Sequence, residues 1–155
     1  MSQESVEYTP APEVEAVARG LIRQHHPHLM TGVRIEYCFV TKTPRSGGKE
    51  VWGTCRKIAG LHAHLAGDGS GDDPFFCITI TKPIWDVMDD RQRAALVDHE
   101  LCHAWVDTDS DGPAKLSTNP HDLEEFGCVV RRHGLWRESV QAFLDDCRRA
   151  GEESE

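Results

Sequence analysis

The sequence has no apolar stretch that approaches the roughly 20 residues needed to cross a membrane. Residues 1–7 are acidic and lack the basic and apolar regions of a secretory signal. The six cysteines are dispersed and none belongs to a CxxC pair, unlike those of a zinc ribbon or a thiol redox site. These absences argue against a membrane protein. They predict a cytoplasmic protein whose cysteines are mostly reduced core residues.

Basic residues are too few to balance the acidic ones. The 17 Lys and Arg residues face 26 Asp and Glu residues, which gives a formal net charge of -9. The negative electrostatic potential of such a chain disfavours binding to nucleic acid unless a local basic patch opposes it. A chain of 155 residues, 39% hydrophobic and 28% charged, is long enough to bury one core without cross-links. We expect a single domain over residues 11–150, between a flexible tail at 1–10 and an acidic tail at 151–155.

The most informative stretch is the pentapeptide HELCH at residues 99–103. Residues four apart on a helix share a face, so His99 and His103 can direct ring nitrogens at one ion about 2 Å away. Glu100 lies beside them and can take a proton from a zinc-bound water whose pKa the metal has lowered to about 7. The spacing therefore favours a zinc-dependent hydrolase with Glu100 as general base.

The residues around this motif favour a helix. Residues 91–97 contain no Gly or Pro, and Asp89 or Asp90 can cap the helix start. Helical periodicity places a second set of side chains away from the ligand face. We expect this set to pack the helix against a sheet: Ala95, Cys102 and Trp105.

A catalytic zinc usually has three protein ligands and a water, so the two histidines need a further partner. Four residues after the motif are candidates: His121, Glu124, Glu125 and His133. His121 is the first choice, because the preceding segment can bring it back to the motif helix. Glu125 or Glu124 is the alternative, although acidic residues in a first helical turn are also favoured by the helix dipole. His133 is read as a histidine near a helix C-terminus.

The remaining pattern predicts an α+β fold. Strands are expected at 32–41 and 75–81, and a further extended segment, compatible with one long strand, is expected at 51–65. The strand at 75–81 is expected to lie beside the cleft with an exposed edge and to be followed by a short loop containing Ile84 and Trp85. Residues 42–49 are read as a turn and 107–120 as a loop. Helices are expected at about 12–24, through the motif, from His121 to Gly134, and at 136–149 with an apolar core stripe.

Other histidines and polar groups are weaker candidates for metal binding or catalysis. We expect five histidines outside the motif to be solvated rather than metal-bound: His25, His26, His28, His62 and His64. For stabilising an oxyanion, Tyr37, His133 and Arg131 are candidates, and the sequence does not choose among them.

Three segments together carry a family resemblance: DHELCHA at 98–104, HDLEEF at 121–126 and VRRHGLW at 130–136. Over about residues 30–136 the chain resembles the putative phage metallopeptidase family, and more distantly the SprT-like proteases. It departs from the HGxxF segment of SprT-like proteases, because Asp122 replaces the glycine and His121 and Phe126 are one residue farther apart. No zinc ribbon follows either, so action on DNA-bound proteins is not carried over.

The resemblance implies a compact zincin-like domain of the minimal gluzincin or SprT-like type, with zinc bound. Its expected layout is an N-terminal helix, a small three-stranded twisted sheet, the motif helix and two C-terminal helices. The resulting hypothesis is a zinc metallopeptidase acting on a protein or peptide substrate, encoded by a phage or prophage and located in the host cytoplasm. The alternative is a metal-stabilised protein-binding module with weak or no hydrolytic activity. A nucleic-acid-bound protease would need a basic patch, which the overall acidity argues against.

Overall fold

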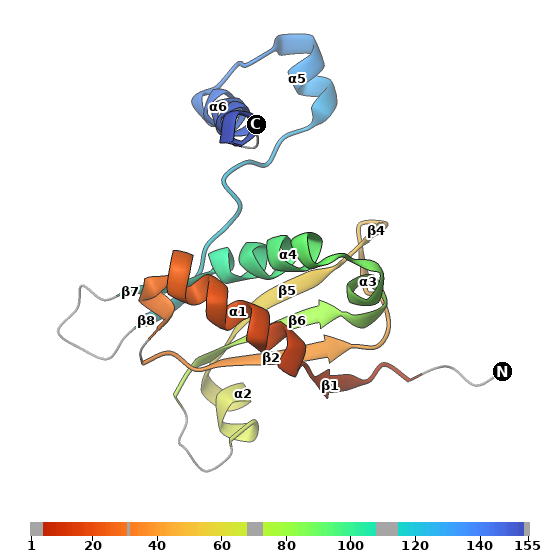
Figure 1. Cartoon of the computed structure of the whole chain (residues 1–155), viewed down its shortest axis with the longest axis vertical. Helices are drawn as coiled ribbons and strands as arrows, with labels where there is room; N and C mark the ends of the chain where they lie inside the picture. Colours follow the sequence, from red (N-terminus) through yellow and green to blue (C-terminus); the bar gives the residue numbers. More distant parts are fainter. Residues whose placement is uncertain (1–4, 31, 68–72, 108–114, 154–155) are drawn as a thin grey trace. The chain divides into compact units, whose positions relative to one another are not determined.

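The computed structural model describes residues 5–30, 32–67, 73–107 and 115–153. It divides the chain into two compact units, Met1–Asn119 and Pro120–Glu155. Figure 1 labels the elements of both units, and each unit is described by itself. The single domain expected over 11–150 stays a prediction.

A four-stranded sheet forms the centre of the first unit, with the strand order β1-β2-β6-β5. These strands are β1 (Tyr8–Pro10), β2 (Ile35–Val40), β5 (Gly53–Ile58) and β6 (Phe75–Thr81). The strand β6 is rich in β-branched and aromatic residues and lies inside the sheet, parallel to β2 and antiparallel to β5. Its boundaries agree with the predicted strand at 75–81.

The sheet has one strand more than predicted, because residues 8–10 pair with β2. The sequence prediction of a flexible tail over 1–10 is therefore wrong for this part, while residues 1–4 lie outside the described residues. The pairing is reinforced where the backbone amide of Glu7 donates to Thr41 Oγ1 at 3.0 Å and the amide of Thr41 donates to the Glu7 carbonyl at 3.0 Å. Backbone pairing, which composition does not reveal, fixes this segment.

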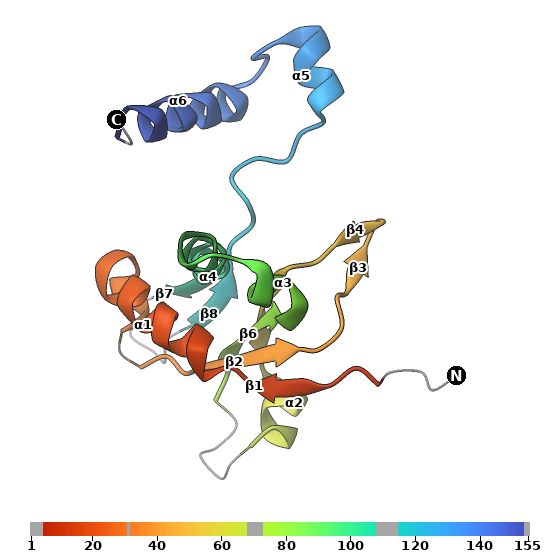
Figure 2. The ribbon, with the colours of Figure 1, turned by 45° about the vertical axis from the view of Figure 1, so that its right-hand side comes forward.

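Two helices pack against each other beside the sheet: α1 (Pro12–His25) and α4 (Asp90–His103) (Figures 1 and 2). The predicted helix at 12–24 is confirmed, and its Val14 and Ala18 are fully buried. On α4 the buried residues include Val97 and Leu101, which follow helical spacing and join the core formed by the inner face of the sheet. The metal motif thus lies on a helix that the core holds on one side.

The extended segment expected over 51–65 ends early, because β5 is followed by the helix α2 (Gly60–Leu65). Gly60 has a φ of +58°, which an extended strand does not accommodate. The apparent alternation after it was misleading, because Ala63 is buried while Leu61 and Leu65 are mostly exposed. His62 and His64 lie on this helix rather than on a strand, and both are exposed as expected.

Two predicted connections contain regular structure. The loop expected around Trp85 is the helix α3 (Lys82–Val87), with Pro83 in its first turn and Trp85 only 1% exposed. Within the loop expected at 107–120, β8 (Lys115–Thr118) pairs antiparallel with β7 (Ala104–Asp107), and residues 108–114 lie outside the described residues.

The predicted turn at 42–49 holds a small hairpin. Its strands are β3 (Arg45–Ser46) and β4 (Lys49–Glu50), joined through Gly47 and Gly48, both with positive φ. A short 3₁₀ helix, η1 (Pro27–Leu29), follows α1.

The second unit contains the helices α5 (Gly127–His133) and α6 (Glu138–Glu153). The helix expected to open at His121 begins only at Gly127, and the Glu125 carboxylate instead accepts from the backbone amide of Phe126 at 2.9 Å. Gly134, with a φ of +68°, follows the last residue of α5 as predicted.

The last helix differs from its prediction in extent and burial. It starts at Glu138 and runs into the predicted acidic tail as far as Glu153, and residues 154–155 lie outside the described residues. Of the apolar stripe expected to be core, Val140 is buried, whereas Phe143 and Cys147 are exposed. No helix in the described part of the chain is long and apolar enough to span a bilayer.

Candidate metal centre

The helix that carries the motif is fixed at its start by a capping box. The backbone amide of Gln92 donates to Asp89 Oδ1 at 2.8 Å, and the amide of Asp89 donates to Gln92 Oε1 at 3.0 Å. Of the two predicted caps, Asp89 is therefore the one used. The helix ends at His103, so His99 and His103 lie one turn apart, with ring centroids separated by 5.2 Å in an edge-on arrangement.

The ring of His103 is oriented by the chain that follows β8. Its Nδ1 lies 2.6 Å from the carbonyl oxygen of Asn119, and the amide of Asn119 donates to the His103 carbonyl at 2.8 Å. Because a carbonyl only accepts, Nδ1 carries the proton in this contact. If His103 binds a metal, Nε2 would then be the ligand atom, an arrangement that is usual for metal-bound histidines.

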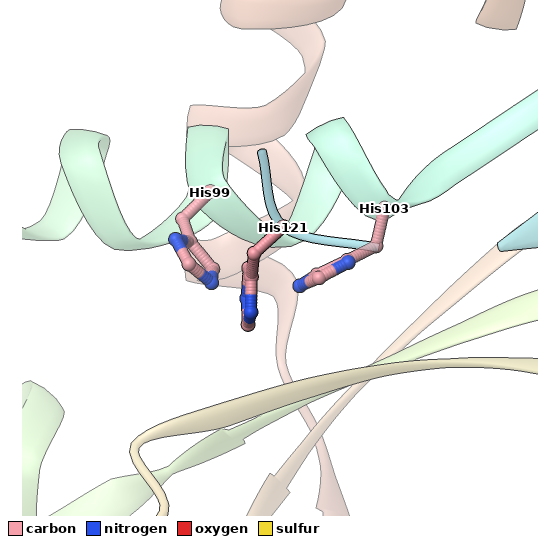
Figure 3. A group of neighbouring side chains, drawn as sticks. All are labelled: His99, His103 and His121. Carbon is pink, nitrogen blue, oxygen red and sulfur yellow. The ribbon is translucent and has the colours of Figure 1, made fainter. Parts of the chain in front are cut away.

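His121 follows Asn119 by two residues and meets the motif histidines. Ligand atoms of His99, His103 and His121 all lie within 4.8 Å of one another. Figure 3 shows the three imidazoles converging on one point. The ligand atoms of a tetrahedral zinc site are roughly 3.3 Å apart, given zinc-nitrogen distances of 2.0–2.1 Å. Three imidazoles at this spacing fit such an ion after small side-chain rotations.

The grouped residues are the three histidines named first in the sequence prediction. In the described part of the chain the group includes neither of the alternative carboxylates, Glu124 and Glu125, nor His133. The choice of His121 as third ligand stays a prediction, and this spacing supports it.

Glu100 follows His99 on α4, interacts electrostatically with His103, and is only 3% exposed. Burial raises the pKa of its carboxyl group from 4.5 to about 7, and the neighbouring His103 partly opposes this rise. The group therefore exchanges its proton near neutral pH. This behaviour suits a residue that first accepts and then returns a proton.

The carboxylate of Glu100 is packed against a glycine that the sequence analysis missed. A Cβ added to Gly53, at the start of β5, would lie 2.9 Å from Glu100 Oε1 and 3.1 Å from Ile80 Cδ1. Real Cβ atoms essentially never approach so closely, so only glycine fits without displacement. A glycine inside a predicted extended segment is a signal of close approach, and it could have marked this position.

A groove of about 700 Å³ adjoins this site. Its lining includes His99 and Glu100, other residues of α4, residues 50–53, and residues of α3 and its C-cap. The wall side chains are mainly apolar: Val51, Trp52, Ile84, Val87, Met88, Ala95 and Leu96. Val87 is 81% exposed and Trp52 is 48% exposed, so an incoming apolar group can reach them from solvent.

Two expectations about the surroundings of the site are wrong. The strand β6 has no exposed edge, because β2 and β5 pair with its two sides, and the strands whose residues line the groove are β4 and β5. Ala95, Cys102 and Trp105 do not pack against the sheet, since all three are exposed. The buried face of α4 instead follows Val97, Glu100, Leu101 and then Ala104, which have the 3.6-residue spacing of a helix.

Of the oxyanion candidates, Tyr37 lies elsewhere. It lines a different cavity, together with Glu15 and Arg19, and burial raises the pKa of its hydroxyl to about 12. Arg131 and His133 belong to the second unit, and their role stays a prediction.

One of the histidines expected to be solvated is buried. His26 is 7% exposed, and its Nε2 lies 2.6 Å from Asp98 Oδ1. His25 is exposed as expected, whereas His28 is half-buried, with its Nε2 3.3 Å from the carbonyl of Ala104. The sequence analysis interpreted Pro27 as part of a solvent-exposed loop, but Pro27 begins η1. The side chains of His26 and His28, on either side of it, contact Asp98 and the carbonyl of Ala104.

Comparison with known proteins gives one match. A family model described as "Putative phage metallopeptidase" matches residues 6–148 of the 155. No curated protein and no solved structure shows significant similarity to the chain.

Proposed function

Because the chain belongs to the putative phage metallopeptidase family, we propose that it is a zinc-dependent peptidase with His99, His103 and His121 as metal ligands and Glu100 as general base. The observation that carries this proposal is the grouping of three imidazoles beside a buried carboxylate whose pKa is about 7. The family name indicates a metal-dependent peptidase. The identity of the metal, the residue roles and the zincin-like fold are our proposal.

When bound, zinc supplies a Lewis acid that polarises the scissile carbonyl and lowers the pKa of a coordinated water to about 7. Glu100 accepts the proton of the attacking water on a carboxylate oxygen while the water oxygen bonds to the carbonyl carbon. The same carboxyl group then gives the proton to the amide nitrogen as the carbon-nitrogen bond breaks. The products are a carboxylate and an amine, and Glu100 returns to its starting form.

The apolar groove suggests which part of a peptide lies next to the reacting bond. Its lining combines His99 and Glu100 with apolar side chains from α4, from α3 and its C-cap, and from residues 51–52. We propose that it receives an apolar side chain adjacent to the scissile bond. Burial of a Leu- or Phe-sized side chain contributes about 1.5–3 kcal/mol, enough to select such a residue.

The family description also suggests the biological setting. We propose a phage or prophage gene product that acts on a protein or peptide in the host cytoplasm. The net charge of -9 supports a protein substrate over nucleic acid.

The alternative of a metal-stabilised binding module has less support. A structural zinc site is normally closed by a fourth protein ligand. Among the described residues the group contains three, which leaves a position for water or substrate. A buried carboxylate beside the ligands is also unnecessary for a purely structural ion.

The test compares the zinc-loaded wild type with Glu100→Gln on casein and on a mixed fluorogenic peptide library. We expect hydrolysis by the wild type, its loss on chelation, and a fall of roughly 10²–10⁴-fold in Glu100→Gln with its zinc content unchanged. Full turnover by Glu100→Gln would refute the general-base role. Zinc binding without hydrolysis of either substrate would favour the binding module.

A further inference from the structure

The helix α4 carries a second pair of metal-binding residue types at helical spacing. Asp98 and Cys102 are four residues apart, as are His99 and His103, and the two pairs are offset by one position. One position rotates a side chain by about 100° around a helix axis. The second pair therefore lies on a neighbouring face of the same helix.

The residue that faces this second pair comes from the end of α1. His26 is the C-cap residue of that helix, and its backbone amide donates to the carbonyl of Ile22 at 3.0 Å. Since α1 packs against α4, the imidazole is held at the Asp98 side of α4, 7% exposed. Ligand atoms of His26, Asp98 and Cys102 all lie within 4.8 Å of one another.

We propose that His26, Asp98 and Cys102 form a second binding site, for a divalent transition metal of the zinc class. Imidazole nitrogen, carboxylate oxygen and thiolate sulfur are all established zinc ligands, with bond lengths of about 2.0–2.3 Å. A tetrahedral ion separates such atoms by roughly 3.3–3.7 Å. The 2.6 Å contact between His26 Nε2 and Asp98 Oδ1 would thus open by about 1 Å as the ion replaces the proton between them.

Access and rigidity differ across the three residues in a way that suits metal uptake. His26 is buried and fixed, the Asp98 side chain is 39% exposed, and Cys102 is exposed. An ion can therefore enter from the Cys102 side. All three residues belong to the first unit, so the site needs nothing from residues 120–155.

The competing interpretation is a hydrogen bond that fastens α1 to α4 with no metal involved. That interpretation needs His26 and Asp98 but assigns nothing to Cys102. The metal site requires the thiol, which lies within 4.8 Å of the imidazole and the carboxylate, whereas the hydrogen bond does not require it. A measurement that reports on the sulfur therefore separates the two interpretations.

The experiment is a titration of the metal-free, full-length protein with cobalt(II), followed by absorption spectroscopy. Thiolate coordination gives an intense near-ultraviolet sulfur-to-cobalt charge-transfer band, which three imidazoles do not produce. We expect this band in the wild type and its loss in Cys102→Ser. The matched control is Cys147→Ser, which removes another exposed cysteine and should leave the band unchanged.

Two further variants separate this site from the proposed catalytic one. His103→Ala should lose one equivalent of cobalt and keep the thiolate band. Asp98→Asn, a nearly isosteric change, should weaken cobalt binding at this band by roughly tenfold or more, since even outer partners of a metal contribute 10–100-fold. A wild type without the band, or a band that persists in Cys102→Ser, would overturn the second site without bearing on the proposed peptidase.

Discussion

Two neighbouring faces of α4 place metal-binding residues at the same spacing but differ in what surrounds them. One face presents His99 and His103, with Glu100 buried beside them and a groove of about 700 Å³ adjoining. The other presents Asp98 and Cys102 facing His26, and neither Asp98 nor Cys102 is among the residues that line that groove. Two metal-binding residue types at positions i and i+4 of a helix therefore indicate a possible metal site, but they do not by themselves indicate a catalytic one.

The difference lies in the neighbours rather than in the ligands. Hydrolysis needs a base that exchanges its proton near neutral pH and space for a substrate, and only the His99 face has both. On the Asp98 face the partner histidine is already engaged with a carboxylate at 2.6 Å. These neighbours support the proposal of catalysis at the first face, and the proposal for the second face is metal binding alone.

The largest expected effect comes from removing a ligand on the first face. His103→Ala should abolish hydrolysis of casein, because the metal loses one of three ligands and the contact that orients His103 through Asn119 is lost as well. The matched control is His62→Ala, which removes an exposed histidine on α2. If His103→Ala hydrolysed casein at the same rate as His62→Ala, the proposed catalytic role of the His99 and His103 face would be contradicted.

The buried Glu100 should make the unfolding free energy of the metal-free protein depend on pH. The folded-state pKa of Glu100 is about 7 against 4.5 without burial, so the folded protein binds more protons between these values. Stability should be full below about pH 4.5 and fall as pH rises to about 7, by roughly 3 kcal/mol in all.

Urea unfolding at pH 5 and pH 8 checks this effect. Glu100→Gln should reduce the difference in unfolding free energy between the two pH values, whereas the exposed control Glu152→Gln should retain it. An equal pH difference in the wild type and Glu100→Gln would contradict the account.

Two glycine-to-alanine variants, compared with each other, test the close packing of Gly53 against Glu100. Gly53→Ala places a Cβ 2.9 Å from Glu100 Oε1, so we expect a loss of about 1–3 kcal/mol in unfolding free energy and reduced peptidase activity. Gly20→Ala, on α1 with nothing within 4 Å of the added atom, should instead stabilise by about 0.5–1 kcal/mol. Thermal unfolding of both variants distinguishes the packing effect from the general effect of replacing glycine.

The smallest expected effect concerns thiol reactivity next to the site. Burial raises the pKa of Cys55 to about 12, with a further contribution from the nearby Glu100, so its thiolate is scarce at pH 8. Iodoacetamide should therefore alkylate exposed Cys147 well before Cys55, as read by peptide mass spectrometry. Equal rates in the native protein would show that β5 is more open than described.

The sequence predicted what local patterns encode and missed what tertiary contacts decide. The helix at 12–24, the strand at 75–81 and the capped motif helix follow from periodicity and capping residues. The extension of the sheet by residues 8–10 and the burial of His26 depend on distant partners, β2 and Asp98, that no local pattern reveals. The helix expected to start near His121 begins only at Gly127, and the backbone amide of Phe126 donates to the Glu125 carboxylate just before it.

Prediction of the candidate metal site is limited in the same way, because local spacing is visible in the sequence and tertiary contacts are not. The motif predicted His99, Glu100 and His103 as site residues from spacing alone, and His121 was favoured by its place after a connecting segment; these roles stay predictions. Gly53 lies 47 positions before Glu100 in the chain. A glycine in an extended segment could have signalled a close approach, but the fold is needed to show that Glu100 is the side chain that it meets.

The most direct test of the central proposal is the zinc content of purified protein by inductively coupled plasma mass spectrometry. Measuring it in a Cys102→Ser background restricts the count to the first face of α4. Our account predicts about one zinc per chain in this parent, its loss in the added variant His121→Ala, and its retention in His133→Ala. Full zinc content in His121→Ala, or none in the parent after reconstitution with zinc, would contradict the three-histidine site.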